Sequence, residues 1–235
     1  MIIEASNSLV ENFTVYNYTD AGIYVHSDSF TIHNVTINKC IIHNSSYNIG
    51  EYGIIFYNVS NSLINNSHVY NNSEVGICLV FSSNNTLTGN NAPNNEYGIC
   101  LEDSSNNTLM NNIMSGNLYN FCLYGNEDSH FNNIIDITNE VDGKPIYYIK
   151  DESNMVIDDT SNAGTIYCIQ CENVTIKDSN LTKNWFGIFF YKTTNSSIEN
   201  VNASNNGEGI SLHHSSNNTL TNNNASNNWG GIYLY

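Results

Sequence analysis

The chain has 235 residues, of which only 12% are charged, yet six lysines face 22 acids and the formal net charge is −16. The sequence contains no arginine and no basic stripe, which argues against nucleic-acid binding. It also lacks any run of 18 apolar residues, so no membrane span is predicted in this segment. An anionic polymer is an unfavourable partner unless a cation such as Ca²⁺ bridges it.

A Gly-Ile dipeptide recurs with a period of about 22 residues. Its copies begin at Gly53, Gly76, Gly98, Gly187, Gly209 and Gly231. Apolar residues alternate after each glycine, which is the spacing of a short strand, and no sustained helical periodicity is present. A repeat of this length suits one turn of a parallel β-helix. The predicted fold class is therefore an all-β, single-stranded parallel β-helix of about ten turns.

Placing the copies in register predicts vertical files of inward-facing residues, spaced roughly 4.8 Å apart along the axis. The first file contains Ile23, Ile54, Ile77, Ile99, Phe121, Tyr147, Ile166, Ile188, Ile210 and Ile232. The second contains Val25, Phe56, Leu79, Leu101, Leu123, Ile149, Cys168, Phe190, Leu212 and Leu234. A second strand adds Ile64, Leu87, Leu109, Phe131, Ile157, Ile176, Ile198 and Leu220. Because one turn cannot bury its own apolar edge, stability must come from neighbouring turns.

Asparagine forms a file of its own at one corner of the repeat. Its members are Asn61, Asn84, Asn106, Asn154, Asn173, Asn195 and Asn217, with Asp128 in the remaining place. Asparagine tolerates the left-handed conformation of a tight corner, and stacked amides can hydrogen-bond along the axis as an asparagine ladder. We therefore predict a structural role for this file.

The outward positions of the first strand are rich in aromatic residues. The residues predicted to form a ligand-binding aromatic face are Tyr124, Tyr148, Tyr167, Phe189, Tyr191 and Tyr233. Rings spaced along an elongated face can stack on the sugar rings of an extended glycan. Packing against a neighbouring domain and simple strand propensity remain alternative interpretations.

The cysteines and the acids give weaker signals. Cys78, Cys100 and Cys122 occupy one outward file, and we predict free thiols there, with the redox state left open. Nine of the 22 acids lie between Glu127 and Asp159, and residues 135–145 are predicted to form a loop excursion. No cofactor is predicted, although oxygen ligands in this acidic region leave Ca²⁺ open as an alternative to a solvated loop.

The unbroken period predicts a single domain over residues 1–235. Both ends of the sequence fall within a turn, so we expect a segment of a longer chain, with any signal or anchor outside it, or self-association through uncapped ends. Asn-x-Ser/Thr sequons are dense, either as glycosylation sites or as a by-product of the repeat.

The repeat from Gly76 to Leu79 and from Ser82 to Leu87 resembles the parallel β-helix repeats of the NosD-like family. The segment Gly143–Tyr148 is similar to one common among archaeal members. The resemblance implies a right-handed β-helix, an extracellular or cell-surface location and frequent contact with polysaccharide. That family is related to carbohydrate-binding and sugar-hydrolysis β-helices, and its founding branch is implicated in copper delivery.

Catalysis is less well supported than binding. The resemblance to β-helix lyases implies a need for basic residues, and this chain has no arginine. Asp158-Asp159 is present without the Gly-His-Gly and basic clamp that polygalacturonase-like hydrolases use. The predicted function is a non-catalytic surface or secreted module that binds polysaccharide or packs in the cell envelope. The alternatives are a polysaccharide lyase or hydrolase, a copper-associated protein, and a structural spacer or filament subunit.

Overall fold

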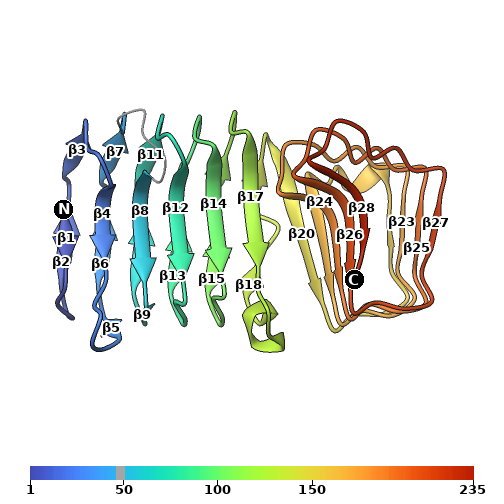
Figure 1. The fold of residues 1–235 in the computed structure, drawn as a ribbon, viewed down its shortest axis with the longest axis horizontal. Coiled ribbons are helices and arrows are strands. Elements are labelled where there is room, and N and C mark those ends of the chain that lie inside the picture. The colour runs from blue at the N-terminus through green and yellow to red at the C-terminus, as the bar shows by residue number, and fades with distance from the viewer. Residues whose placement is uncertain (46–50) are drawn as a thin grey trace. The chain divides into compact units, whose positions relative to one another are not determined.

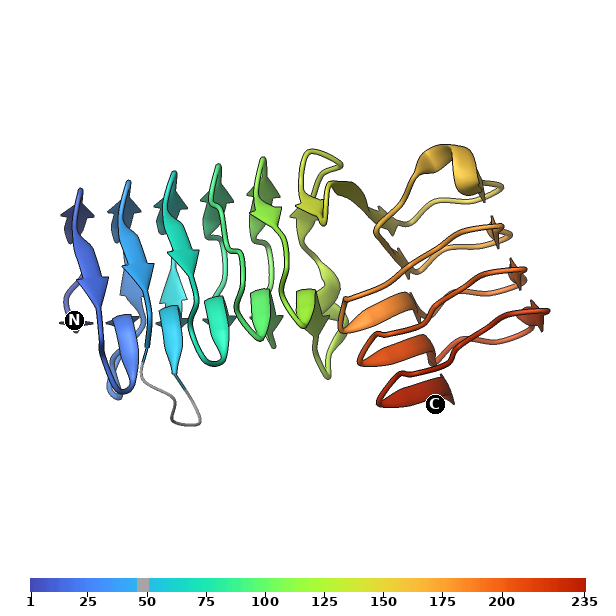
Figure 2. The ribbon, with the colours of Figure 1, turned by 90° about the horizontal axis from the view of Figure 1, so that it is seen from above.

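The computed structural model describes residues 1–45 and 51–235 as a parallel β-solenoid of about ten turns (Figures 1 and 2). Among these residues the only helices are two short 3₁₀ segments, η1 (Asp128–Phe131) and η2 (Asp159–Ser161). Contacts divide the chain into two compact units, unit 1 (Met1–Asp142) and unit 2 (Gly143–Tyr235). The unbroken period had predicted one domain.

Unit 1 consists of turns that pair strand on strand. Its long sheet contains β1 (Ile2–Ile3), β4 (Ala21–Val25), β8 (Tyr52–Tyr57), β12 (Val75–Val80), β14 (Tyr97–Glu102) and β17 (Tyr119–Tyr124). Its second sheet contains β2 (Leu9–Glu11), β6 (Thr36–Asn38), β10 (Leu63–Asn65), β13 (Thr86–Thr88), β15 (Thr108–Met110) and β18 (Ile134–Ile135). Its third sheet contains β3 (Thr14–Tyr16), β7 (Ile41–His43) and β11 (His68–Tyr70). Two further pairs are β5 (Ile32–His33) with β9 (Val59–Ser60) and β16 (Ile113–Met114) with β19 (Glu140–Val141).

Unit 2 repeats this arrangement with two sheets. Its long sheet contains β20 (Lys144–Lys150), β22 (Thr165–Ile169), β24 (Phe186–Tyr191), β26 (Glu208–His213) and β28 (Gly230–Leu234). Its second sheet contains β21 (Val156–Ile157), β23 (Thr175–Lys177), β25 (Ser197–Glu199) and β27 (Thr219–Thr221).

The strand register places the inward residues in the predicted files. Ile77 pairs with both Ile54 and Ile99, and all three are fully buried. In unit 2, Ile188 pairs with Ile166 and Ile210 in the same way. The core is therefore a narrow column within each unit, and adjacent turns bury each other's apolar edges.

One member of the second-strand file was predicted wrongly. Leu109 pairs with Ile135, whereas Phe131 lies in η1 and is buried there. The 3₁₀ helix inserts extra residues between β17 and β18, and this insertion shifts the register by four positions. Because Phe131 is also large and apolar, composition alone did not distinguish it from Ile135.

The glycine of the repeat is required by close approach between turns. A Cβ on Gly76 would lie 2.7 Å from the carbonyl oxygen of Gly98, and one on Gly53 would lie 2.5 Å from that of Gly76. Any side chain here would collide with the backbone of the next turn. This packing explains why the Gly-Ile dipeptide marks each turn.

The corner asparagines adopt the predicted left-handed conformation, with φ of 59° at Asn84 and 55° at Asn106. Asp128 does not belong to this file, because it lies in η1, and the amide N–H of Asn106 instead donates to the carbonyl oxygen of Asn132.

A buried asparagine ladder lies one residue further along the repeat. Asn107 accepts from the backbone N–H of Asn85 (2.9 Å) and donates to the carbonyl of Ser82 (3.0 Å), and its side chain is fully buried. These amides satisfy backbone groups that the strands leave unpaired at the corners.

The region predicted as a loop excursion, residues 135–145, contains strand structure. It includes the end of β18, all of β19 and the start of β20. A turn at Asp142 (φ 48°) and Gly143 (φ 76°) separates β19 from β20. The boundary between the two units falls at this turn.

Candidate functional site

The outer face of the long sheet of unit 1 has a floor of small side chains. Cys78, Cys100 and Cys122 pair in register on β12, β14 and β17, and their exposed fractions are 3%, 6% and 1%. Ile55 on β8 continues the file. Their side chains point away from the core because their strand neighbours on either side point inward.

Tyrosines lie on both sides of this floor. Tyr97 and Tyr119 pair on adjacent turns on one side, with ring centroids 5.2 Å apart and ring planes at 40°. Tyr57 and Tyr124 lie on the other side, with exposed fractions of 37% and 38%. We call these four residues, together with Glu102 between Tyr57 and Tyr124 in register, the tyrosine face.

Three tyrosines of the tyrosine face have raised pKa values. Burial raises the pKa of Tyr124. The neighbouring Cys100 and the hydrogen bond between Tyr124 and Glu102 raise this pKa further. Burial is also the main cause of the raised pKa of Tyr97 and of Tyr119. The hydroxyls of these three tyrosines keep their protons at neutral pH, and each ring has an apolar surface, so the face combines hydrogen-bonding groups with apolar area.

The long sheet of unit 2 differs, although five of the six predicted ligand-binding residues lie on it. Tyr167, Phe189 and Tyr191 are buried, with exposed fractions of 0%, 2% and 4%, and Tyr148 and Tyr233 are partly buried. The ring of Tyr167 packs against those of Phe189 (5.6 Å) and Phe186 (6.0 Å). The structure thus leaves Tyr124 exposed but places Tyr167, Phe189 and Tyr191 out of solvent, because large neighbouring rings cover one another.

Sequence reasoning missed part of the tyrosine face. Tyr97 and Tyr119 are the first residues of β14 and β17, immediately before the position of the repeat glycine, so they were not counted among the outward residues that follow it. The recurrence of tyrosine immediately before this position, also at Tyr52, was the available signal.

All six cysteines are free and buried. Cys78 and Cys100 hydrogen-bond within their file, and this contact raises the pKa of Cys78. In unit 2, the Cys168 thiol donates to Cys171 and lowers the pKa of Cys171 to about 7. This contact, and burial after it, raise the pKa of Cys168 itself.

Two acids that a catalytic reading would have to use, Asp158 and Asp103, have structural partners. Asp158 caps η2, where its Oδ1 accepts from the backbone N–H of Thr160 (3.1 Å) and from its hydroxyl (2.6 Å). These hydrogen bonds lower the pKa of Asp158, so it remains a carboxylate. Asp103, at a corner with φ of 44°, lies 3.0 Å from His130 Nδ1. Both acids hold local turns in place.

Comparison with known families identifies two stretches of the chain. A family model described as "Right handed beta helix region" matches residues 1–139. A second model, described as "Periplasmic copper-binding protein (NosD)", matches residues 132–235. A comparison with curated proteins found no match.

Three solved structures show a distant similarity to this chain. The A-module of mannuronan C-5 epimerase AlgE6 from Azotobacter vinelandii is 13% identical with a TM-score of 0.40, and the match covers 94% of this chain and 56% of that one. The A-module of AlgE4 from the same organism is 15% identical with a TM-score of 0.32, covering 100% and 79%. An alginate lyase from Paenibacillus sp. str. FPU-7 is 13% identical with a TM-score of 0.38, covering 95% and 98%. This chain therefore spans about half the length of the AlgE6 module, and similarity at this level does not transfer an activity.

The copper implied by the description of the second family does not fit the side chains present. Within residues 1–45 and 51–235, no group of three or more His, Cys, Asp or Glu side chains is arranged to hold a metal ion. Cys78, Cys100 and Cys122 follow the axis turn by turn instead of converging on one point. Among the histidines, which are common copper ligands, His213 already hydrogen-bonds through Nε2 to the hydroxyl of Ser211 (3.0 Å).

The described residues contain no helix of the length and hydrophobicity needed to cross a membrane.

The repeat, the parallel register and the match over residues 1–139 agree on one assignment. The chain belongs to the right-handed parallel β-helix family, and its C-terminal part is NosD-like.

Proposed function

We propose that this chain is a non-catalytic, polysaccharide-binding β-solenoid of the cell envelope or the extracellular space, and that the tyrosine face of unit 1 is its binding surface. The observation that carries this proposal is the arrangement of Tyr97 and Tyr119 on one side, and Tyr57 and Tyr124 on the other, of a flat floor of thiols. Partly exposed rings that repeat along a rigid, extended surface suit a ligand that is itself extended and repetitive.

The charge of the chain narrows the class of polysaccharide. The net charge is −16, and Glu102 lies within the tyrosine face itself. A polyuronate would be repelled at this surface, whereas a neutral or amino-substituted glycan would not. The proposed ligand is therefore a neutral or amino-substituted polysaccharide.

Two observations support binding without turnover. Glycoside hydrolysis uses two carboxyl groups about 5–10 Å apart across the sugar. Asp158 is occupied as a helix cap, and Asp103 is adjacent to His130.

The description of the NosD family as periplasmic supports the envelope location.

Retention of the purified chain on insoluble polysaccharides tests the proposal. We expect retention on cellulose, chitin or chitosan and none on calcium-free alginate beads that are cross-linked covalently. The double variant Tyr97→Ala/Tyr124→Ala should lose retention, because it removes one ring from each side of the floor. Tyr16→Ala is the matched control, since Tyr16 is a 61% exposed ring on the third sheet, away from the tyrosine face.

A parallel assay for reducing ends and unsaturated products separates binding from catalysis. Product release that disappears in Asp158→Asn would establish the enzyme alternative and contradict the proposal. Equal retention of the wild-type chain and the double variant would show that the tyrosine face is not the binding surface.

A further inference from the structure

One corner of unit 1 holds an apolar residue in a conformation that polar residues otherwise adopt. Phe81 directly follows β12 and has φ of 48°. In the described parts of the chain, every other non-glycine residue with positive φ is Asn, Asp, Lys, Gln or His. The left-handed region brings Cβ close to the following carbonyl oxygen, and a bulky side chain without local hydrogen bonds gains nothing there in return. Phe81 therefore carries backbone strain.

The path of the solenoid imposes this conformation. The same corner of the preceding and following turns holds Asn58 (φ 55°) and Asp103 (φ 44°). The backbone N–H of Phe81 donates to the carbonyl oxygen of Glu102 (3.1 Å), as that of Asp103 does to the carbonyl oxygen of Tyr124 (3.1 Å). Asparagine would adopt this corner with less strain. Because the fold alone does not call for phenylalanine here, the strained position indicates a function.

Packing does not account for the ring either. The side chain of Phe81 is 53% exposed, and its one ring contact is edge to face with Tyr57, at 5.7 Å between centroids and 87° between planes. Tyr57 is itself 37% exposed and belongs to the tyrosine face. A contact between two half-exposed rings buries little apolar surface. The two rings instead continue the accessible aromatic surface of the tyrosine face past the end of β12.

Polar side chains lie on both sides of Phe81 along the axis. Asn58 Oδ1 accepts from the hydroxyl of Thr31 (3.0 Å), and Asp103 Oδ1 lies 3.0 Å from His130 Nδ1. These contacts tie the two neighbouring corners to the segments around β5 and η1, which protrude at the lower edge of unit 1 in Figure 1. An open ring between polar groups matches a pyranose, which has an apolar C–H face and a rim of hydroxyls.

We propose that Phe81 is a sugar-contacting residue, and that its ring stacks on one pyranose unit of the polysaccharide that crosses the tyrosine face. The inference rests on the proposed function and extends its binding surface from the sheet to the corner. The unit bound here is neutral or amino-substituted, because Glu102 and Asp103 on the next turn disfavour a uronate. A second copy of this chain is a poorer occupant, since each copy has a net charge of −16.

Three variants separate a sugar contact from a structural role. Phe81→Asn removes the ring and supplies the residue type found at this corner in the preceding turn. Phe81→Trp keeps an aromatic ring at the same position. Phe13→Asn is the matched control, because Phe13 is a 51% exposed phenylalanine between β2 and β3 and does not have positive φ.

Isothermal titration calorimetry with cellohexaose and chitohexaose measures the contact. We expect Phe81→Asn to weaken the affinity for the hexaose that binds by at least about threefold, and Phe81→Trp and Phe13→Asn to keep it within about twofold. In denaturant unfolding, the midpoint of Phe81→Asn should equal or exceed that of the wild type, because asparagine tolerates the corner conformation. Weaker binding without a loss of stability is the signature of a ligand contact.

Three results would overturn the inference while leaving the proposed function in place. The first is unchanged affinity in Phe81→Asn, when the wild-type chain binds and Tyr97→Ala/Tyr124→Ala does not. The second is a lower unfolding midpoint in Phe81→Asn, which would make the ring structural. The third is a wild-type dimer in sedimentation that Phe81→Asn dissociates, which would show that a second copy covers the ring. Binding of neither hexaose by the wild-type chain would instead contradict both the inference and the proposed function.

Discussion

The two long sheets have the same strand register but different outer faces. In unit 1 the central outward file consists of Cys78, Cys100 and Cys122, and the tyrosines beside it are partly exposed. In unit 2 the same file contains Tyr167 and Phe189, which are themselves buried. Small residues in the central file leave the flanking rings open to solvent, whereas large ones fill the surface and become part of the packing. An aromatic-rich outward file is thus a poorer indicator of a binding face than a small-residue file with aromatic neighbours.

The largest expected effect is on stability in unit 2. Tyr167→Ala removes a fully buried ring packed on Phe189 and Phe186, and we expect it to lower the free energy of unfolding by about 3–5 kcal/mol. Tyr124→Ala in unit 1 removes a 38% exposed ring and should cost about 1 kcal/mol or less. Denaturant titration of both variants measures the difference. Equal losses would remove the distinction between the two faces.

The next effect concerns the asparagine ladder of unit 1. Asn107→Ala leaves the backbone N–H of Asn85 and the carbonyl of Ser82 without partners in the buried corner, at an expected cost of about 2–3 kcal/mol. Asn106→Gly, at the neighbouring exposed corner with φ of 55°, keeps the conformation and should change stability by less than about 1 kcal/mol. Thermal unfolding of the two variants distinguishes the buried ladder from the corner file. A larger loss in Asn106→Gly would contradict this assignment.

A smaller effect should appear on acidification. Burial lowers the pKa of His68 in unit 1 and of His213 in unit 2, and the neighbouring His43 and His214 lower them further. The unfolded chain therefore takes up these protons more readily, so the free energy of unfolding should fall as the pH drops below about 6.5.

Unfolding midpoints above and below that pH, compared between wild type and His213→Gln, isolate the contribution of unit 2. The raised pKa values of Glu96 and Glu208 act in the opposite direction at lower pH, but they are present in both proteins and cancel in the difference. The variant should show a weaker loss on acidification, and a steeper loss would show that the sign is wrong.

The stacking of the core could be predicted from the sequence because it depends on period and alternation. Ile77 and Leu79 have neighbours of the same kind one period away, and the strand register confirms both files. Prediction failed where a local insertion interrupts the period, as at η1, where Ile135 and not Phe131 occupies the file. It also did not distinguish the two members of an Asn-Asn pair. Asn106 forms the corner and Asn107 forms the ladder, because only the second side chain turns inward.

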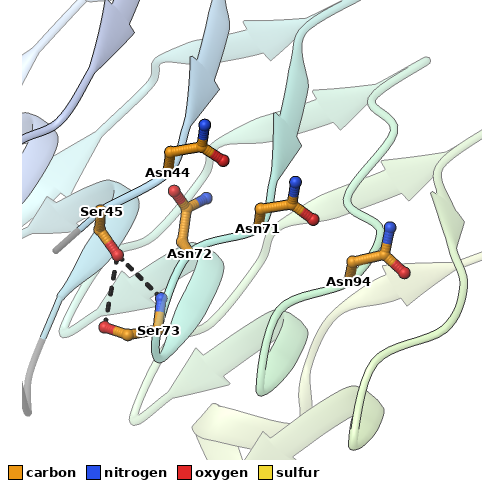
Figure 3. A pocket seen from close by; sticks show the side chains of 6 residues that line it. All are labelled: Asn44, Ser45, Asn71, Asn72, Ser73 and Asn94. Atoms are coloured by element: carbon orange, nitrogen blue, oxygen red, sulfur yellow. Dashed lines mark hydrogen bonds between the residues drawn. The ribbon is translucent and has the colours of Figure 1, made fainter. Parts of the chain in front are cut away.

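Exposure of the candidate site could not be predicted in the same way. Alternation shows that Tyr167 and Cys100 both point outward, but the size of the surrounding side chains determines which surface remains accessible. A polar depression lined by Asn44, Asn71 and Asn94 (Figure 3) was not anticipated either, because the repeat marks the corner positions but not the space left between neighbouring turns.

A crystal structure of the chain with a short oligosaccharide, cut from whichever polysaccharide retains it, tests the central claim most directly. The account predicts sugar rings along the tyrosine face, against Tyr97, Tyr119 and Tyr124, with their glycosidic bonds intact. Sugar bound over the long sheet of unit 2 instead, or a cleaved oligosaccharide beside Asp158, would contradict it.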